Sequence, residues 1–211
     1  LFRSGDTLIH KGTALAQRHM ALDFAELSSQ GGLFARDMAL TGSRLTLNGT
    51  LETTQGADLQ GDTLQLGGES RIGTALTLGA TLLSLSGTQQ IGGALQLEAK
   101  EADLGGELEV GADLKVRAET LRSAGKVLAK QADIDAGQWD QQGVLAADDA
   151  LVWRGTRLTQ QDTGVLLADG KVSLAGGTVN LAGTLAAKGH VGITAGNYVQ
   201  LGTLNTVQGL N

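Results

Sequence analysis

The sequence predicts an all-β protein, a right-handed parallel β-helix (solenoid) built from about ten coils of 19 residues each. Three observations predict this class. An apolar anchor residue recurs about every 19 residues, apolar residues stand two positions apart around it, and a glycine follows it by nine positions. A spacing of two places side chains on one face of a strand, whereas 19 residues are too few for two helices with their turns.

The anchor residues show the repeat most clearly. Successive anchors are mostly 19 residues apart, with two steps of 18 and one of 21. The residue two positions before each anchor is apolar in every coil, and the residue two positions after it is Gly or Ala in every coil but the first. This small residue indicates a bend with no room for a larger side chain. The anchors are Leu22, Leu40, Leu59, Leu78, Leu97, Val116, Ile134, Trp153, Leu174 and Ile193.

A glycine nine positions after the anchor marks the next corner of the coil. We interpret it as a turn residue with positive φ, a conformation that other residues adopt only at a cost. In one coil a two-residue insertion at residues 160–163 delays this glycine to Gly164 and explains the step of 21. The insertion is the one place where a loop is expected to protrude. Two positions after the glycine the residue is usually apolar, with Ser70 and Gln89 as exceptions.

Composition narrows the class further. Hydrophobic residues make up 41% of the chain but aromatic residues only 3%, so Leu, Val, Ile and Ala must fill the interior. The chain has no Cys, which excludes disulfides, thiolate metal sites and cysteine nucleophiles. The net charge of −6 argues against nucleic acid as a partner, and no apolar run of 18 residues is present to span a membrane.

The uniform repeat predicts a single unit. Residues 1–211 are expected to form one β-helical repeat segment, and a start without an initiator Met or a signal peptide predicts an internal fragment of a longer protein. Other repeat classes fit less well. Leucine-rich repeats need a recurrent Asn or Cys position, the calcium-binding nonapeptide pattern is absent, and 19 is not a multiple of the six residues of left-handed hexapeptide helices.

The combined pattern is apolar-x-apolar-x-Gly/Ala-x-x-Leu-x-x-x-Gly-x-apolar, with clear examples at residues 95–99 (LQLEA) and 114–121 (LKVRAETL). Over residues 20–204 it resembles the repeats of the filamentous haemagglutinin family. The resemblance implies a very large bacterial exoprotein, exported through an outer-membrane two-partner-secretion transporter, with a β-helical shaft that serves adhesion. Related members carry toxins for contact-dependent inhibition. The family's export domain carries Asn-Pro motifs, and this chain has no Pro, so the resemblance is to the shaft.

Residues that could carry chemistry are sparse and scattered. The three histidines, His10, His19 and His190, are too far apart in the repeat for a common site and are expected at the surface or in turns. Two pairs of carboxylates come nearest to what acid–base catalysis needs: Asp148 with Asp149, and Asp133 with Asp135. Asp133 and Asp135 flank the inward anchor Ile134 and are therefore expected to point outward. We therefore expect no catalytic, cofactor-binding or metal-ligating residues, and no cofactor.

Two sets of side chains have a predicted place in the stack. One position after the anchor, successive coils carry Glu98, Arg117, Asp135 and Arg154, which are expected to form one outer ladder of alternating charge that helps to fix the register. Trp139, Trp153 and Tyr198 could stack on a sugar ring. Because all three occupy inward repeat positions, they are expected to pack in the core.

Two functions from different classes remain open. The first is a structural shaft segment of a large secreted or surface-displayed bacterial adhesin, without enzymatic activity. Its partners would be a host-cell receptor or glycan, bound through the parent protein, and the transporter during export. The alternative is a carbohydrate-binding or carbohydrate-active β-helix module, which an exposed cleft with three or more convergent carboxylates would favour.

Overall fold

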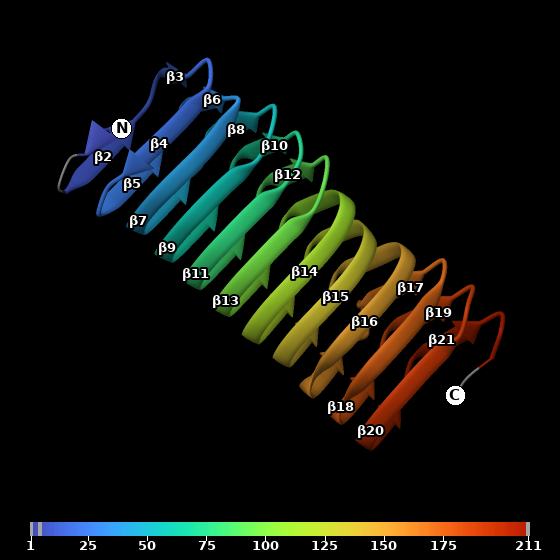
Figure 1. Cartoon of the computed structure of the whole chain (residues 1–211). Helices are drawn as coiled ribbons and strands as arrows, with labels where there is room; N and C mark the ends of the chain where they lie inside the picture. The colour runs from blue at the N-terminus through green and yellow to red at the C-terminus, as the bar shows by residue number, and fades with distance from the viewer. Residues whose placement is uncertain (1, 4–5, 210–211) are drawn as a thin grey trace.

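The computed structural model describes residues 2–3 and 6–209, and it shows a rod of stacked coils with the two ends of the chain at opposite ends of the rod (Figure 1). The described residues form strands and no helix. Every strand pairing is parallel, and coils of about 19 residues stack into a β-solenoid of about 11 turns. The predicted all-β parallel solenoid is therefore confirmed.

The strands fall into eleven successive coils. The first six coils contain β1 (Phe2–Arg3), β2 (Thr7–His10), β3 (Thr13–Leu15), β4 (His19–Asp23), β5 (Glu26–Ser29), β6 (Gly32–Ala35), β7 (Asp37–Leu47), β8 (Thr50–Thr53), β9 (Ala57–Leu66), β10 (Glu69–Ile72), β11 (Leu76–Leu85), β12 (Thr88–Ile91) and β13 (Leu95–Leu104). The long strands that follow bend around corners and join one coil to the next. They and the last short strands are β14 (Glu107–Ser123), β15 (Lys126–Gln141), β16 (Val144–Gln160), β17 (Val165–Ala168), β18 (Lys171–Leu181), β19 (Thr184–Ala187), β20 (Val191–Gln200) and β21 (Thr203–Thr206).

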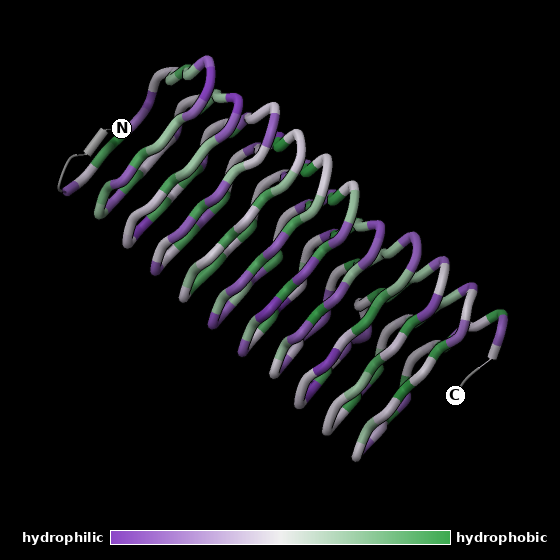
Figure 2. The backbone as a smooth tube through the Cα atoms, in the orientation of Figure 1, coloured by the Kyte–Doolittle hydropathy of each residue, from purple (hydrophilic) through white to green (hydrophobic). Residues whose placement is uncertain are grey.

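Each coil has three strand faces. In the coil anchored at Leu97, the first face is residues 95–99, the second is residues 101–104 and the third is residues 107–110. Side chains alternate between the interior and the solvent along the faces of the central coils, as the alternating colours along the tube show (Figure 2). These face names are used for the equivalent residues of all coils.

The register of the strands confirms the anchor ladder. Each predicted anchor is paired with the next one, from Leu22 with Leu40 to Leu174 with Ile193. The structure has about 11 turns where about ten were predicted, because Phe2 also pairs with Leu22 and Leu8 pairs with Leu27. This first coil escapes the pattern because its anchor lies 20 residues before the next, outside the usual step.

The interior is a set of apolar ladders that run along the rod. Leu40, Leu59 and Leu174 are 0% exposed, and all residues two positions before the anchors are buried. Burying one such Leu stabilises the fold by about 1.5–3 kcal/mol relative to leaving it exposed. Because each ladder needs the coils above and below, stability arises from stacking and not within one coil.

The recurrent glycine has a different cause from the predicted one. Among the described residues, Gly209 alone has a positive φ, so the corner glycines are not left-handed turn residues. Instead they stack directly on one another. A Cβ on Gly68 would overlap the carbonyl oxygen of Gly49, and one on Gly87 would overlap that of Gly68. Glycine is required because the backbones of adjacent coils approach too closely for any side chain.

A polar ladder lies inside the second half of the rod, on the second face. Ser123, Gln141 and Gln160 are paired in register and are 3%, 0% and 1% exposed. Gln141 Nε2 donates to the carbonyl oxygens of Gly143 at 2.6 Å and Val165 at 3.2 Å, bridging the corners of two coils. Gln160 repeats this arrangement one coil later. Earlier in the chain, the same ladder consists of Leu47, Leu66, Leu85 and Leu104, and we call this part of the rod the aliphatic half.

The aromatic residues meet the prediction in two cases of three. Trp139 and Trp153 are 1% and 0% exposed, and Trp139 Nε1 donates to Ser123 Oγ at 2.8 Å. Tyr198 pairs in register with buried Val179, but it is 40% exposed because it lies in the last described coil. Its expected place in the core is wrong. Partial burial still desolvates the phenol and raises the pKa of Tyr198.

Candidate functional site

A ladder of alternating charge stands on the first face, in the middle of the rod. Its side chains are one position after the anchors and point outward. The register pairs Glu98 with Arg117, Arg117 with Asp135, and Asp135 with Arg154. All four side chains are exposed. The prediction that they form one outer ladder is confirmed, because consecutive members are direct neighbours on parallel strands.

A second row of charge lies beside this ladder, one position before the anchors. Lys115 and Asp133 are paired in register there, and both are exposed. Arg154 Nη1 donates to Asp133 Oδ1 at 2.6 Å, so this ion pair runs diagonally between the two rows. The two rows together form the charged cluster: Glu98, Lys115, Arg117, Asp133, Asp135 and Arg154.

The charged cluster surrounds a shallow hollow that is open to solvent. The hollow has a volume of about 270 Å³, and Thr77 and Gln96 extend its lining beyond the cluster. The coils on either side carry small or neutral outward residues, such as Gly79 on one side and Ser173 and Ala175 on the other. The first face therefore has charged side chains at its centre and low relief around them.

The composition of the charged cluster limits what it can bind. Three carboxylates alternate with three basic groups, so the cluster carries no net charge and has no general attraction for a polyanion. Arg154 is already paired with Asp133, and the described residues include no other ion pair within the cluster. Its groups are held by strands at fixed intervals of about 4.8 Å. Such a surface suits a partner with the complementary sequence of charges.

The inserted residues do not form a protruding loop. Residues 161–164 make a tight turn in which Gly164 N donates to Gln161 O at 3.0 Å. Gln161 Nε2 donates to Asp140 Oδ1 at 2.9 Å, and Thr163 Oγ1 donates to the backbone carbonyl oxygen of Gln142 in the preceding coil at 3.0 Å. Asp162 and Thr163 alone are exposed within the turn. The insertion is tied to the rod and offers little surface for a partner.

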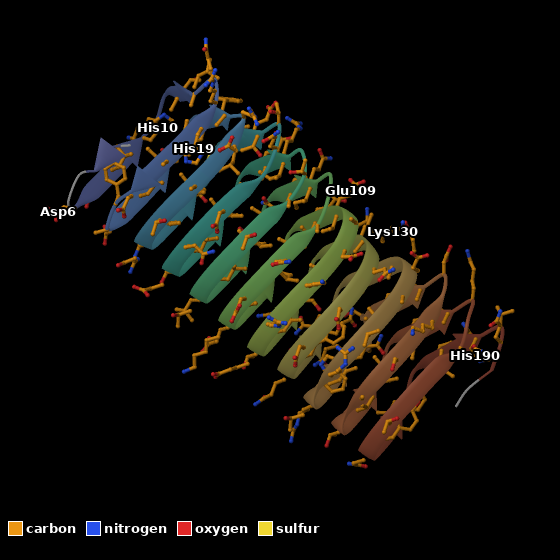
Figure 3. All side chains as sticks on the ribbon, viewed as in Figure 1. Asp6, His10, His19, Glu109, Lys130 and His190 are labelled. Atoms are coloured by element: carbon orange, nitrogen blue, oxygen red, sulfur yellow. The ribbon has the colours of Figure 1, made fainter. Side chains whose placement is uncertain are left out.

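The three histidines are separated as expected. His10 and His19 lie near one end of the rod, and His190 lies near the other (Figure 3). His10 Nδ1 is 2.9 Å from Ser29 Oγ, and His19 is paired with Asp37. These two contacts join adjacent coils, and no site in the described part of the chain includes two of the histidines.

The two predicted pairs of carboxylates lie on different surfaces of the rod. Asp148 and Asp149 are exposed at a corner of β16, whereas Asp133 and Asp135 point outward from the first face, as predicted. No three His, Asp or Glu side chains of the described residues are close enough to hold a metal ion. No helix that is long and apolar enough to cross a membrane occurs in the described part of the chain.

A second surface was not predicted. On the third face, outward apolar residues of β15, β16, β17 and β19 form a stripe of adjacent side chains. Leu167, at its centre, is 36% exposed. The signal in the sequence is that residues at the outward positions of this face change from charged to apolar along the chain. The apolar stripe consists of Leu128, Val144, Ala146, Val165, Leu167 and Ala186.

Comparisons of the chain with protein-family models, with curated proteins and with solved structures find no match. The fold is therefore established by the coil register alone, and the candidate site by the positions of the charged cluster. Sequence reasoning found the ladder of four charges through its spacing. It did not find the second row, because Lys115 and Asp133 stand before the anchors and not after them.

Proposed function

We propose that this chain is a structural shaft segment of a large secreted or surface-displayed bacterial adhesin that attaches its producer to host cells. The observation that carries the proposal is the unbroken stacking of about 11 similar coils, in which the insertion at residues 160–163 is a tight turn. An uninterrupted solenoid holds the parts on either side of it at a fixed separation. The shape of its faces varies too little from coil to coil to form an enclosed site. The resemblance to filamentous haemagglutinin repeats supports the same role.

The dimensions of the rod suit a spacer. At about 4.8 Å per coil, the segment extends about 50 Å along its axis. Continuous ladders of buried, mostly apolar side chains hold the coils together along this length without disulfides. In the parent protein, such a segment would carry adhesive parts away from the cell surface. A host receptor or glycan would be bound through those parts, and the outer-membrane transporter would act during export.

Cell-binding experiments test the shaft role. The fluorescently labelled 211-residue chain is added over a range of concentrations to cultured epithelial cells. A spacer gives no saturable binding above that of a labelled control protein of similar size and charge. Saturable binding that disappears in the Arg117→Glu variant would contradict the proposal, because it would make the charged cluster a recognition site.

Surface display is tested separately. Antibodies raised against the purified chain are applied to intact cells of the producing bacterium and to permeabilised cells. The proposal predicts labelling of intact cells or of the culture medium. Labelling that requires permeabilisation would place the chain inside the cell and would exclude an adhesin shaft.

A carbohydrate-binding or carbohydrate-active module is the second candidate. The hollow in its favour is lined by the carboxylates of Glu98, Asp133 and Asp135. Against it, Trp139 and Trp153, the side chains best suited to stack on a sugar, are buried in the core. A glycan array probed with the labelled chain decides between the candidates: retention of one glycan class that is lost in Asp135→Asn supports the module.

A further inference from the structure

We propose that the first face pairs with the first face of a second copy of this chain, in an antiparallel dimer held by the charged cluster. The proposal concerns lateral association and is independent of whether the rod serves as an adhesin shaft. It follows from the order of charges along two adjacent rows, which complements itself when one copy is turned around.

The relevant symmetry is a two-fold axis parallel to the strands of the first face, midway between the coils that carry Arg117 and Asp135. Rotation about this axis reverses the order of the coils but keeps each row opposite itself. Arg117 then faces Asp135 of the second copy, and Glu98 faces Arg154. Such an interface is isologous, so each of these contacts occurs twice.

The second row obeys the same rule. Lys115 faces Asp133 of the second copy, and the reciprocal contact is equivalent. All six members of the charged cluster therefore face a group of opposite sign. The neutral residues match as well, because the coil that carries Gly79 faces the coil that carries Ala175. Small residues in these flanking coils allow the two faces to approach.

Two other kinds of arrangement place like charges together. If the axis passed through the coil of Arg117, that residue would face its own copy, as would Lys115. If the two rods were parallel, with the axis along the rod, Asp133 would face Asp135 and Lys115 would face Arg117. Juxtaposed like charges disfavour these alternatives. Moving the axis by one coil in either direction also avoids like charges, but then one pair of ladder residues faces opposite charges and the other four members of the cluster face neutral residues. The axis between the coils of Arg117 and Asp135 gives all six members an opposite charge, so the charge order favours this register.

The free chain leaves most of the cluster unpaired. Among the described residues, Glu98, Lys115, Arg117 and Asp135 take part in no ion pair, although they are neighbours in the two rows. Their side chains stand exposed around the 270 Å³ hollow. A second copy would supply an opposite charge for each of them, and the facing side chains would fill the hollow.

The size of the face sets the expected strength. Eight coils at about 4.8 Å and five strand residues at about 3.4 Å give roughly 650 Å² per copy. The total buried area of about 1,300 Å² is at the lower end of the range for specific interfaces. We therefore expect a weak dimer, with a dissociation constant in the micromolar range. Because the contacts are charged and lie at the surface, salt should dissociate the dimer.

Analytical ultracentrifugation of the whole chain tests the proposal. At about 100 μM chain, a dimer is expected in about 50 mM NaCl and a monomer in about 500 mM NaCl. Arg117→Glu and Asp135→Arg each place like charges opposite one another and should weaken self-association by at least tenfold, or about 1.4 kcal/mol. Arg157→Glu, an exposed change on the second face, is the matched control and should dimerise like the wild type.

Mixing the two variants gives the sharpest result. In a mixture of Arg117→Glu with Asp135→Arg, the new acid at position 117 faces the new base at position 135, and the unchanged residues also face opposite charges. The mixture should form a heterodimer although neither variant dimerises alone. Recovery in the mixture also shows that both variants are folded.

Three outcomes would overturn the proposal. The first is a wild-type monomer in low salt, and the second is the absence of a heterodimer in the mixture. The third is self-association that persists in Arg117→Glu but disappears in Leu167→Ser, which would assign it to the apolar stripe. None of these results depends on cell binding, so the dimer and the shaft role succeed or fail separately.

Discussion

The two halves of the rod share one backbone pattern but differ in what fills the interior. Between Leu40 and Leu104 the inward residues of the first and second faces are aliphatic or small, and the second-face ladder is a run of leucines. From Ser123 to Gln160 the same ladder is polar, and two tryptophans pack beside it. The coil is therefore specified by its corners and anchors, while the interior tolerates polar side chains that have hydrogen-bond partners.

The hydrogen bonds explain this tolerance only in part. The Nε2 atoms of Gln141 and Gln160 each donate to two backbone carbonyls, and Trp139 donates to Ser123. The Oε1 atoms of both glutamines are buried without a partner. An unsatisfied buried acceptor costs about 1–3 kcal/mol. Because Gln89 Oε1 and Asp103 Oδ1 in the aliphatic half are also buried without a partner, these acceptors do not make one half less stable than the other.

The largest effect is expected for Trp153→Ala in the polar half, compared with Leu78→Ala in the aliphatic half. Both remove a fully buried anchor side chain, and the expected losses of unfolding free energy are about 3–5 and 2–5 kcal/mol. Trp153 also donates to the carbonyl oxygen of Ala136 at 3.2 Å, which truncation leaves without that donor. Guanidinium unfolding followed by circular dichroism measures both; a smaller loss for Trp153→Ala than for Leu78→Ala would contradict tight packing in the polar half.

The corner glycines should behave alike in both halves, because their role is a contact between backbones. Gly68→Ala and Gly125→Ala each place a Cβ against the carbonyl oxygen of the preceding corner glycine and should cost about 1–3 kcal/mol. Gly105→Ala is the matched control, because the nearest atom to its Cβ would be 3.6 Å away. Thermal unfolding of the three variants tests this, and equal melting temperatures for all three would refute the backbone contact.

Exchanging a leucine and a glutamine of the second-face ladder should lower the unfolding free energy in the aliphatic half and change it little in the polar half. Leu85→Gln buries a polar amide among leucines and is expected to cost about 1–3 kcal/mol. Gln141→Leu removes an amide whose Oε1 has no partner, while the carbonyl oxygen of Gly143 keeps its bond from Val165 N at 2.9 Å. Its effect should be within about 1 kcal/mol of zero. Urea titration of both variants decides, and a larger loss for Gln141→Leu would show that the polar ladder stabilises the rod.

The smallest effect on stability is expected in the charged cluster. Asp133→Asn removes the ion pair with Arg154. The side chain of Asp133 is 50% exposed and that of Arg154 is 57% exposed. Exposed pairs contribute about 0–1 kcal/mol, and screening by salt reduces that further. The change in unfolding free energy should therefore be small in low salt and vanish in high salt. A loss of several kcal/mol would mean that the cluster holds the coils together.

Much of the fold could be predicted because the repeat exposes it. Identical spacing in successive coils places anchors such as Leu59 and Leu78 on one ladder, and the structure confirms that register. The extra coil was missed because its anchor, Phe2, lies 20 residues before Leu22, although Leu8 keeps the 19-residue step to Leu27. The cause of the corner glycines was also hidden, since close approach and positive φ both select glycine and only coordinates separate them.

The candidate site was predictable to a lesser degree. Spacing predicted the ladder from Glu98 to Arg154, because it follows from the register alone. The diagonal pairing of Arg154 with Asp133 depends on side-chain reach, which the repeat does not encode. Likewise, the buried place of Gln141 was hidden because a glutamine at one coil position carries no apolar signal.

Distances between spin labels test in-register stacking most directly. The chain has no Cys, so pairs of cysteines can be placed at Thr41 and Arg117, or at Thr41 and Ala175, which are four and seven coils apart in one outward row. Double electron–electron resonance in high salt should give distances of about 19 Å and about 34 Å. Distances that do not increase with the number of coils would contradict the stacked rod.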